Sequence, residues 1–245
     1  MDNIEEICKR FLDDPNSIFY VLNHREKQVF RNRLISKTYR KGEYIFRVGD
    51  IPSGLICLAK GKAKVFQEGV GGREQIVRMA KPIGFIGYRA LFAEEIHAAS
   101  AVAIEESTVV SLDYETLSSI MDANSQLCQL IIKSLAAELG FSYFRTVTLT
   151  QKQIPGRLAE SLLFLKDTYG FERDGMTLKV CLSREDIAKL SNMSTSNAIR
   201  TLSYFANNGL IGIEGKKIKL IDMPGLEEMS DERKFDGSLK YTSTP

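Results

Sequence analysis

A seven-residue segment in the C-terminal half of the chain carries a cluster of hydrogen-bonding and basic side chains: Ser194, Thr195, Ser196, Asn197 and Arg200. Hydroxyl and amide groups can bond phosphate oxygens, and a guanidinium can hold O6 and N7 of guanine. We therefore predict a surface for double-stranded DNA, with Arg200 contacting a base. Ser194, Thr195 and Asn197 are predicted to contact phosphates, directly or through water. The alternatives for Arg200 are a phosphate contact or an ion pair within the protein.

Two short helices joined by a tight turn would position this cluster. Ser183 can cap the first helix, with Asp186 three residues later in a capping-box arrangement. Asn192 falls where the turn needs a residue that tolerates positive φ, and Ser194 or Thr195 can cap the second helix. Asn208-Gly209 ends it. The predicted buried faces are Ile187, Ala188 and Leu190 on the first helix, and Ala198, Ile199, Leu202 and Phe205 on the second.

A small β-hairpin is predicted directly after these helices. Residues 210–213 and 218–221 are apolar except for Lys219 and flank a turn at residues 215–217. Lys216 and Lys217 lie in this turn, where the phosphate backbone of DNA is the partner within reach; the alternative is a solvated turn. The whole segment predicts a winged helix-turn-helix, which places its second helix in the major groove.

Composition limits the classes of function. The net charge is only +2, so basicity has to be local: residues 151–225 carry 11 Lys and Arg against 8 Asp and Glu. The start of the chain lacks the pattern of a secretion signal, and no uninterrupted apolar run reaches the roughly 18–20 residues of a membrane span. We expect a cytoplasmic protein with no membrane partner.

The sequence lacks the residue patterns that are typical of metal sites and of enzymes built on a β-roll. The four cysteines, Cys8, Cys57, Cys128 and Cys181, are far apart, unlike the close pairs of metal and iron–sulfur sites. An enzyme built on a β-roll would need two or three histidines and a carboxylate on a metal, and the chain has only His24 and His97. We therefore expect no enzyme activity, no catalytic residues, no metal site and no cofactor.

Short β-type segments separated by glycine turns predict a β-roll or jelly-roll-like sandwich over residues 38–113. The predicted strands are residues 44–46, 55–58, 63–66, 75–79, 99–104 and 108–112. Residues 1–35 look helical. From residue 114 to about 151 the apolar period becomes helical, and we interpret the part from residue 123 onward as a long helix that forms a coiled-coil-like dimer seam. Leu127, Ile131, Leu135 and Phe141 are the predicted seam residues. The alternative is a helix packed only on its own roll. A hinge at residues 151–156, a helix at 157–169 and a strand at 177–182 follow.

These patterns predict an α+β protein in four parts. Residues 1–122 hold the N-terminal helices and a β-roll effector domain, and residues 123–152 the dimerisation helix and hinge. Residues 153–225 hold the winged helix-turn-helix domain. Residues 226–245 are polar and predicted to be a disordered tail.

The order of β-roll, long helix and winged helix-turn-helix resembles the Crp–Fnr family of bacterial transcription regulators. Lys41-Gly42-Glu43, Gly49-Asp50, Lys60-Gly61-Lys62 and residues 84–87 (Gly-Phe-Ile-Gly) support the resemblance, which spans about residues 20–222. It implies a homodimer in which an effector-sensing roll positions two recognition helices on a palindromic site. RNA polymerase is a further partner that it suggests. It also places Arg200 where the family has a guanine-reading arginine and Ser196 where the family commonly has a glutamate.

The resemblance also indicates where an effector would bind: Gly87, Tyr88, Arg89, Ala98 and Ala99. Cyclic-AMP-binding members carry a glutamate for the ribose hydroxyl, where this chain has Tyr88, and an Arg-Ser pair for the phosphate, where it has Ala98-Ala99. Both charged contacts are missing, so we expect no cyclic AMP binding. Arg89 is a candidate replacement for holding an anion, against the alternative of a surface or salt-bridged arginine. His97, which lies in the same loop, is expected to be solvated.

The function we infer is a homodimeric DNA-binding transcription regulator that responds to an unidentified effector. The alternative is a small-molecule-binding regulatory module without a direct DNA role.

Overall fold

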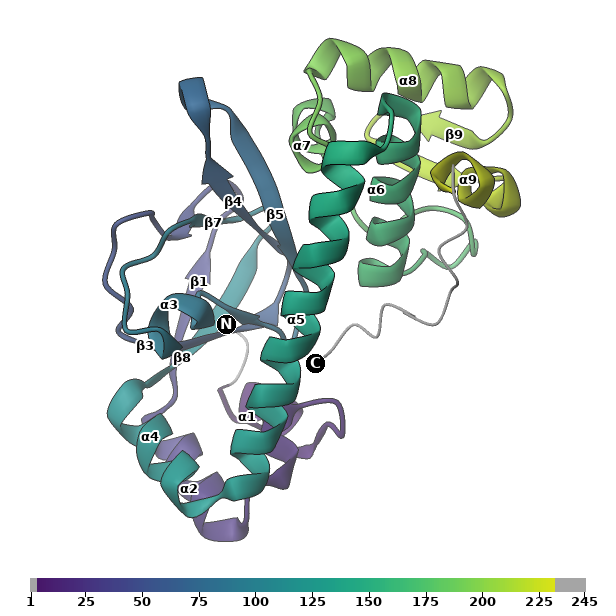
Figure 1. The fold of residues 1–245 in the computed structure, drawn as a ribbon. Coiled ribbons are helices and arrows are strands. Elements are labelled where there is room, and N and C mark those ends of the chain that lie inside the picture. Colours follow the sequence, from purple (N-terminus) through teal and green to yellow (C-terminus); the bar gives the residue numbers. More distant parts are fainter. Residues whose placement is uncertain (1–3, 232–245) are drawn as a thin grey trace. The chain divides into compact units, whose positions relative to one another are not determined.

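The computed structural model describes residues 4–231 (Figure 1). It divides into two compact units. The first holds residues 4–73 and 77–139, and the second holds residues 140–231 together with residues 74–76. The division falls inside one long helix, α5 (Ser125–Gln151).

The first unit is a β-roll covered by helices. Its helical elements are α1 (Ile4–Asp13), η1 (Ile18–Val21), α2 (His24–Arg33), η2 (Val70–Gly72), α3 (Tyr88–Phe92), α4 (Tyr114–Ala123) and the first part of α5. Its strands are β1 (Ile35–Tyr39), β2 (Tyr44–Phe46), β3 (Gly54–Lys60), β4 (Ala63–Glu68), β5 (Glu74–Ala80), β6 (Phe85–Ile86), β7 (Ser100–Ala103) and β8 (Ser107–Asp113). The sequence patterns had predicted six of these strands; β1 and the two-residue β6 were missed.

The strands form two four-stranded sheets, in the orders β1-β8-β3-β6 and β2-β7-β4-β5. The pairings are antiparallel where their register is defined, for example Leu55 opposite Leu112 between β3 and β8. This arrangement confirms the predicted β-roll.

Strand β3 shows why the roll needs helices around it. Successive side chains of a strand point to opposite faces. Leu58 packs in the apolar core that also holds Phe46 and Val65 of the other sheet. Leu55 and Cys57 point the other way, into a second core formed with the helices. One sheet is therefore buried on both faces.

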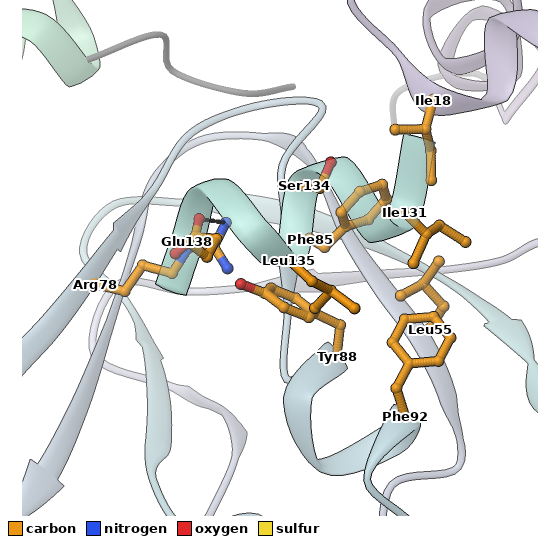
Figure 2. A pocket seen from close by; sticks show the side chains of 10 residues that line it. All are labelled: Ile18, Leu55, Arg78, Phe85, Tyr88, Phe92, Ile131, Ser134, Leu135 and Glu138. Atoms are coloured by element: carbon orange, nitrogen blue, oxygen red, sulfur yellow. Dashed lines mark ion pairs between the residues drawn. The ribbon is translucent and has the colours of Figure 1, made fainter. Parts of the chain in front are cut away.

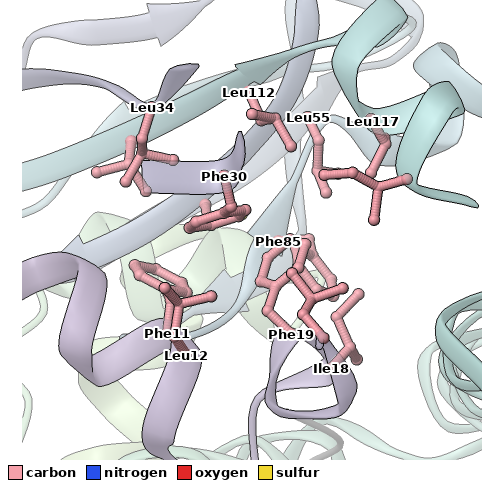
Figure 3. Close-up of a cluster of buried hydrophobic side chains, with 14 of the residues drawn as sticks. Phe11, Leu12, Ile18, Phe19, Phe30, Leu34, Leu55, Phe85, Leu112 and Leu117 are labelled. Carbon is pink, nitrogen blue, oxygen red and sulfur yellow. The ribbon is translucent and has the colours of Figure 1, made fainter. Parts of the chain in front are cut away.

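The second core is rich in aromatic side chains (Figure 3). Phe19 contacts Phe11, Phe30 and Phe85 with ring-centroid distances of 6.4, 4.5 and 6.0 Å. These residues come from α1, η1, α2 and β6, so the N-terminal helices are part of the roll's core rather than a separate segment.

Helix α5 contributes its inner face to this core, which corrects the predicted seam. Leu127 and Ile131 are only 0% and 6% exposed within a single protomer, so they cannot contact a partner helix. Leu135 is half-buried against the same core. Phe141 lies in the second unit, where it is half-buried and stacks on Phe164 of the same unit with ring centroids 5.2 Å apart. The apolar side chains that remain exposed on α5 are Ile132, Leu139, Tyr143 and Val147.

By length and composition alone, α5 could cross a membrane. The core helix of a soluble protein can have the same length and composition. One face of α5 packs on the roll core, and Glu138 on this helix forms an ion pair with Arg78 at 2.8 Å. These contacts occupy side chains that a spanning helix would present to lipid. The apolar composition of α5 is therefore weak evidence for a membrane role.

The second unit contains the end of α5, α6 (Ile154–Tyr169), α7 (Arg184–Leu190), α8 (Thr195–Asn207), strands β9 (Ile211–Glu214) and β10 (Lys217–Leu220), and α9 (Met223–Ser230). The predicted strand at residues 177–182 is wrong: this segment forms only two isolated bridges, Phe171 with Leu178 and Thr177 with Lys219. Asp174 accepts the backbone N–H groups of Met176 and Thr177, which holds a turn rather than a paired strand.

The predicted disordered tail is wrong for its first residues. Helix α9 extends to Ser230, and Leu226 is fully buried. Glu160, buried on α6, forms an ion pair with Lys152 at 2.8 Å and a short hydrogen bond with the Ser230 hydroxyl. A buried carboxylate needs such partners, so α9 is part of the domain. Residues 232–245, the rest of the predicted tail, lie outside the described residues.

Candidate nucleic-acid interface and effector cleft

The two helices of the predicted helix-turn-helix begin and end as their sequence signals indicated. The Ser183 hydroxyl accepts the backbone N–H of Asp186 at the start of α7. Asn192 adopts a φ of 50° in the turn, and the Ser194 hydroxyl accepts the N–H of Asn197 at the start of α8. Gly209, with a φ of 72°, follows the last turn of α8. Short polar residues therefore fix both ends of the motif.

One face of α8 is buried and the opposite face is free for a ligand. Ala198, Leu202 and Phe205 are buried, as predicted. Ile199 is not: its side chain is 48% exposed, which corrects the predicted buried face. Ser194, Thr195, Ser196 and Arg200 are exposed, and Asn197 is half-buried.

Arg200 is available for an external partner. Its guanidinium donates one hydrogen bond to Asn197 Oδ1 at 3.3 Å and has no ion pair with a carboxylate in residues 4–231. The internal ion pair considered for Arg200 is therefore absent from the described part of the chain. The contact with Asn197 leaves the other guanidinium donors free, which a two-pronged contact with guanine requires.

The wing hairpin carries its two lysines at the tip. Lys216 and Lys217 are exposed beside Gly215, whose φ is 60°. Lys219 lies further down the strand and pairs with Glu214 at 2.6 Å, a contact that raises the pKa of the lysine and lowers that of the carboxyl. The tip lysines, rather than Lys219, are therefore the cations that can approach a phosphate.

Two arginines that the sequence analysis missed hold the motif together. Arg184 at the start of α7 donates to the Gly215 carbonyl at 2.8 Å, which connects the first helix to the wing. Arg145, buried near the end of α5, donates to the carbonyl of Leu190, the last residue of α7, at 2.6 Å. A cation at this end of a helix complements the helix dipole. A lone arginine in the last, mostly uncharged turns of α5 was the available signal.

A second candidate site is a cleft inside the first unit, between α5 and the roll (Figure 2). The cleft is open: its empty space of about 380 Å³ includes solvent outside the cleft. Most of its lining is apolar and comes from η1, β3, β6, α3 and α5: Ile18, Leu55, Phe85, Phe92, Ile131 and Leu135. The polar lining consists of Arg78, Tyr88, Ser134 and Glu138.

The polar groups of the cleft largely satisfy one another. Arg78 pairs with Glu138 at 2.8 Å and lies over the Tyr88 ring, 4.9 Å from its centroid. Burial raises the pKa of Tyr88 to about 12, while the positive charge of Arg78 opposes that shift. Tyr88 is therefore a neutral hydrogen-bonding group at pH 7. The Ser134 hydroxyl is buried without a hydrogen-bond partner among residues 4–231.

Of the five predicted effector residues, the structure brings only Tyr88 to this cleft. Gly87 begins α3 with a φ of 74°, where an added Cβ would lie 2.7 Å from His97 Cε1. Arg89 is exposed and pairs with Glu95 at 2.8 Å. Ala98 is exposed, and Ala99 packs against the core between the sheets. The sequence analysis did not predict Arg78 or Glu138 as residues of this cleft. The signal that could have indicated Glu138 is that it is the only acidic residue of α5.

His97 is buried rather than solvated. It is 4% exposed and stacks on Phe46 with ring centroids 4.0 Å apart. Its backbone N–H donates to Asp50, and its carbonyl accepts from Gly49. Burial lowers the pKa of the imidazole, and the positive charge of Arg89 lowers it further, while Asp50 opposes the shift. His97 is therefore a neutral packing residue of the roll.

Comparison with known proteins agrees with this architecture. A family model described as cyclic nucleotide-binding domain matches residues 36–124, and one described as Crp-like helix-turn-helix domain matches residues 156–229. The chain is 28% identical over 186 residues to the CRP-like cAMP-activated global transcriptional regulator of Mycobacterium tuberculosis H37Rv, covering 75% of this chain and 83% of that protein. It is 26% identical over 190 residues to the transcriptional activator protein FnrA of Stutzerimonas stutzeri, covering 76% and 77%.

A solved structure shares the fold. FixK2 from Bradyrhizobium japonicum matches with a TM-score of 0.74 at 21% identity, over 82% of this chain and 99% of that one. A β-roll, a long helix and a winged helix-turn-helix in this order define an effector-sensing, DNA-binding transcription regulator. The chain belongs to the Crp–Fnr family of these regulators.

Proposed function

We propose that the protein is a cytoplasmic homodimer that binds a palindromic DNA site and is regulated through the cleft between α5 and the roll. We propose that it has no enzyme activity. We also propose RNA polymerase as a further partner. The observation that carries the proposal is the free face of α8, where Arg200 lacks a carboxylate partner among the described residues, beside the exposed wing lysines. These cations match an external polyanion.

The exposed stripe on α5 supports the dimer. Ile132, Leu139, Tyr143 and Val147 recur at spacings of seven, four and four residues, which keeps them on one side of the helix. They are 64%, 52%, 65% and 48% exposed within one protomer. A run of large apolar side chains is costly in water, and the same stripe on a second copy would cover it.

The cleft supports an effector other than cyclic AMP. A cyclic nucleotide needs a cation for its phosphate, but the charge of Arg78 is already matched by Glu138 and that of Arg89 by Glu95. Tyr88 occupies the position of the ribose-binding glutamate and is uncharged. Apart from Ser134, the lining that remains is apolar. We therefore propose an apolar effector, or regulation without one.

Selection of binding sites from random double-stranded DNA tests the DNA-binding proposal. We expect the selected sequences to share a palindrome with a guanine at the same position in each half-site. Failure to enrich any sequence above the starting pool would contradict the proposal. It would favour the alternative of a regulatory module that binds only small molecules.

Titration calorimetry with cyclic AMP tests the proposed effector chemistry separately. Each missing charge-assisted hydrogen bond removes roughly 1.5–3 kcal/mol, so we expect no heat of binding at micromolar nucleotide. A micromolar dissociation constant would mean that the Arg78–Glu138 pair opens to release a cation.

A further inference from the structure

An isoleucine lies on the DNA-facing side of α8 without a packing reason. Ile199 is 48% exposed, although the residues on either side of it in the sequence follow the amphipathic pattern: Ala198 is fully buried and Arg200 is exposed. Isoleucine is also a weaker helix former than alanine, because its branched side chain loses rotamer freedom in a helix. Neither the core nor helix formation accounts for this residue, and its exposed side chain is available to an external partner.

The position of Ile199 on the helix is specific. With about 100° between successive residues, Ser196 and Ser203 form the centre of the exposed face. Arg200 lies about 40° to one side of Ser196 and Ile199 about 60° to the other. The two side chains therefore flank the same row of serines and would face neighbouring base pairs in a major groove.

The major groove offers one apolar group, the 5-methyl group of thymine. A buried methyl group gains roughly 0.8 kcal/mol of transfer free energy, which is about a fourfold change in affinity. The other bases present only hydrogen-bonding edges there, which an isoleucine would desolvate without compensation. An exposed isoleucine beside a guanine-binding arginine would thus favour thymine over the other three bases.

We infer that Ile199 is a specificity-determining residue that contacts the methyl group of a thymine within about two base pairs of the guanine bound by Arg200. The inference rests on the proposed DNA-binding function of α8. It adds a hydrophobic contact that selects T·A at one position of each half-site.

Replacement of thymine by deoxyuridine tests this contact, because deoxyuridine lacks only the methyl group. Each thymine of the selected operator is replaced in turn, in both half-sites, and affinity is measured by fluorescence anisotropy. We expect one position at which wild-type protein binds about fourfold more weakly for each methyl removed. Ile199→Ala should bind the unmodified operator more weakly and should be insensitive to deoxyuridine at that position.

Ile221→Ala provides a matched control. Ile221 is an isoleucine of the same domain with a similar exposure, 56%, but it lies just beyond β10 rather than on α8. We expect this variant to keep the wild-type response to deoxyuridine. Because both isoleucines are exposed, we expect both variants to keep the wild-type melting temperature.

Several outcomes would overturn the inference. Equal sensitivity of wild type and Ile199→Ala would assign the methyl contact to another residue, and insensitivity of the wild type at every thymine would remove the contact. If specific DNA is selected, either result refutes only the role of Ile199. If no DNA sequence is selected at all, the proposed function fails and this inference fails with it.

Discussion

At the scale of single residues, the DNA-facing surface separates specificity from affinity. Arg200 lies on a rigid helix, where a guanidinium can be held in one geometry against a base edge. Lys216 and Lys217 are exposed at the tip of the wing hairpin, and a flexible ammonium acts mainly as a point charge. Substitution of Arg200 should therefore change which sequences are bound, whereas substitution of a wing lysine should change how tightly all sequences are bound.

Arg200→Ala and Lys217→Ala should differ in kind. Loss of Arg200 should cost about 1–3 kcal/mol and relax the preference at one position of each half-site. Loss of Lys217 should weaken binding to all sequences alike and reduce the salt slope by about one per contact. Selection profiles and salt titrations of both variants measure this. An Arg200→Ala profile that matches wild type at every position would assign the base contact to Ser196 or Asn197 instead.

His97 should make the stability of the roll depend on pH. Its pKa in the folded protein is lowered by burial, so the unfolded state binds more protons as the pH falls. The free energy of unfolding should be highest above about pH 6.5, the unfolded value, and fall as pH drops toward the folded value, by at most about 1.4 kcal/mol per pH unit. Urea unfolding at pH 5.5, 6.5 and 7.5 measures the slope.

His97→Gln is the matching variant, since glutamine does not titrate. The urea concentration at its unfolding midpoint should be lower at every pH, because the stack with Phe46 is lost. Its free energy of unfolding should, however, depend less steeply on pH than that of the wild type. A slope equal to that of the wild type would show that other groups determine the pH dependence.

At the scale of elements, α5 serves two different surfaces. Its inner face belongs to the roll core through Leu127 and Ile131, and its outer face carries the exposed stripe at Leu139 and Tyr143. A substitution on α5 should therefore affect either folding or association, according to its face.

Leu139→Glu should give a monomer. A charge in the centre of the stripe would have to be buried against its symmetry mate, which costs more than the stripe gains. Lys133→Glu places the same side chain about 120° round the helix from Leu139 and should remain dimeric. Analytical ultracentrifugation compares the two, and the monomer should bind the operator at least a hundredfold more weakly. If Leu139→Glu sediments as a dimer, the partner contacts some other surface.

Leu127→Ala should behave in the opposite way. This residue is fully buried in its own protomer, so truncation should cost about 2–5 kcal/mol of folding free energy. The folded fraction should still associate. Thermal unfolding and sedimentation at the same protein concentration distinguish the two effects. Loss of the dimer without loss of stability would return Leu127 to the seam.

At the scale of the whole molecule, two-fold symmetry should dictate the operator. Two recognition helices related by a dyad require half-sites about 10–10.5 base pairs apart, one turn of DNA. Inserting five base pairs between the half-sites would turn one of them to the opposite side of the duplex. We expect the affinity to fall to that of an isolated half-site, as measured by anisotropy. Unchanged affinity would mean that the two DNA-binding units act independently.

Much of the architecture followed from local patterns in the sequence. Ser183, Asn192 and Ser194 marked the helix-turn-helix because caps and positive-φ turns depend on neighbours only a few residues away. Glycine turns and alternating apolar residues marked six strands of the roll. The two-residue β6 was missed because its ladder to β3 is tertiary, and a segment so short has no period of its own.

Only the tertiary structure decided which faces are buried. Helix α5 carries apolar residues on most sides, so its period cannot say whether Ile131 or Ile132 points inward; the adjacent roll core decides it. The same holds for Ile199, which the pattern of α8 placed in the core. The Arg78–Glu138 pair joins β5 to α5 across a long stretch of chain. Caps and turns are determined by neighbours in sequence, whereas burial and ion pairs are determined by neighbours in space.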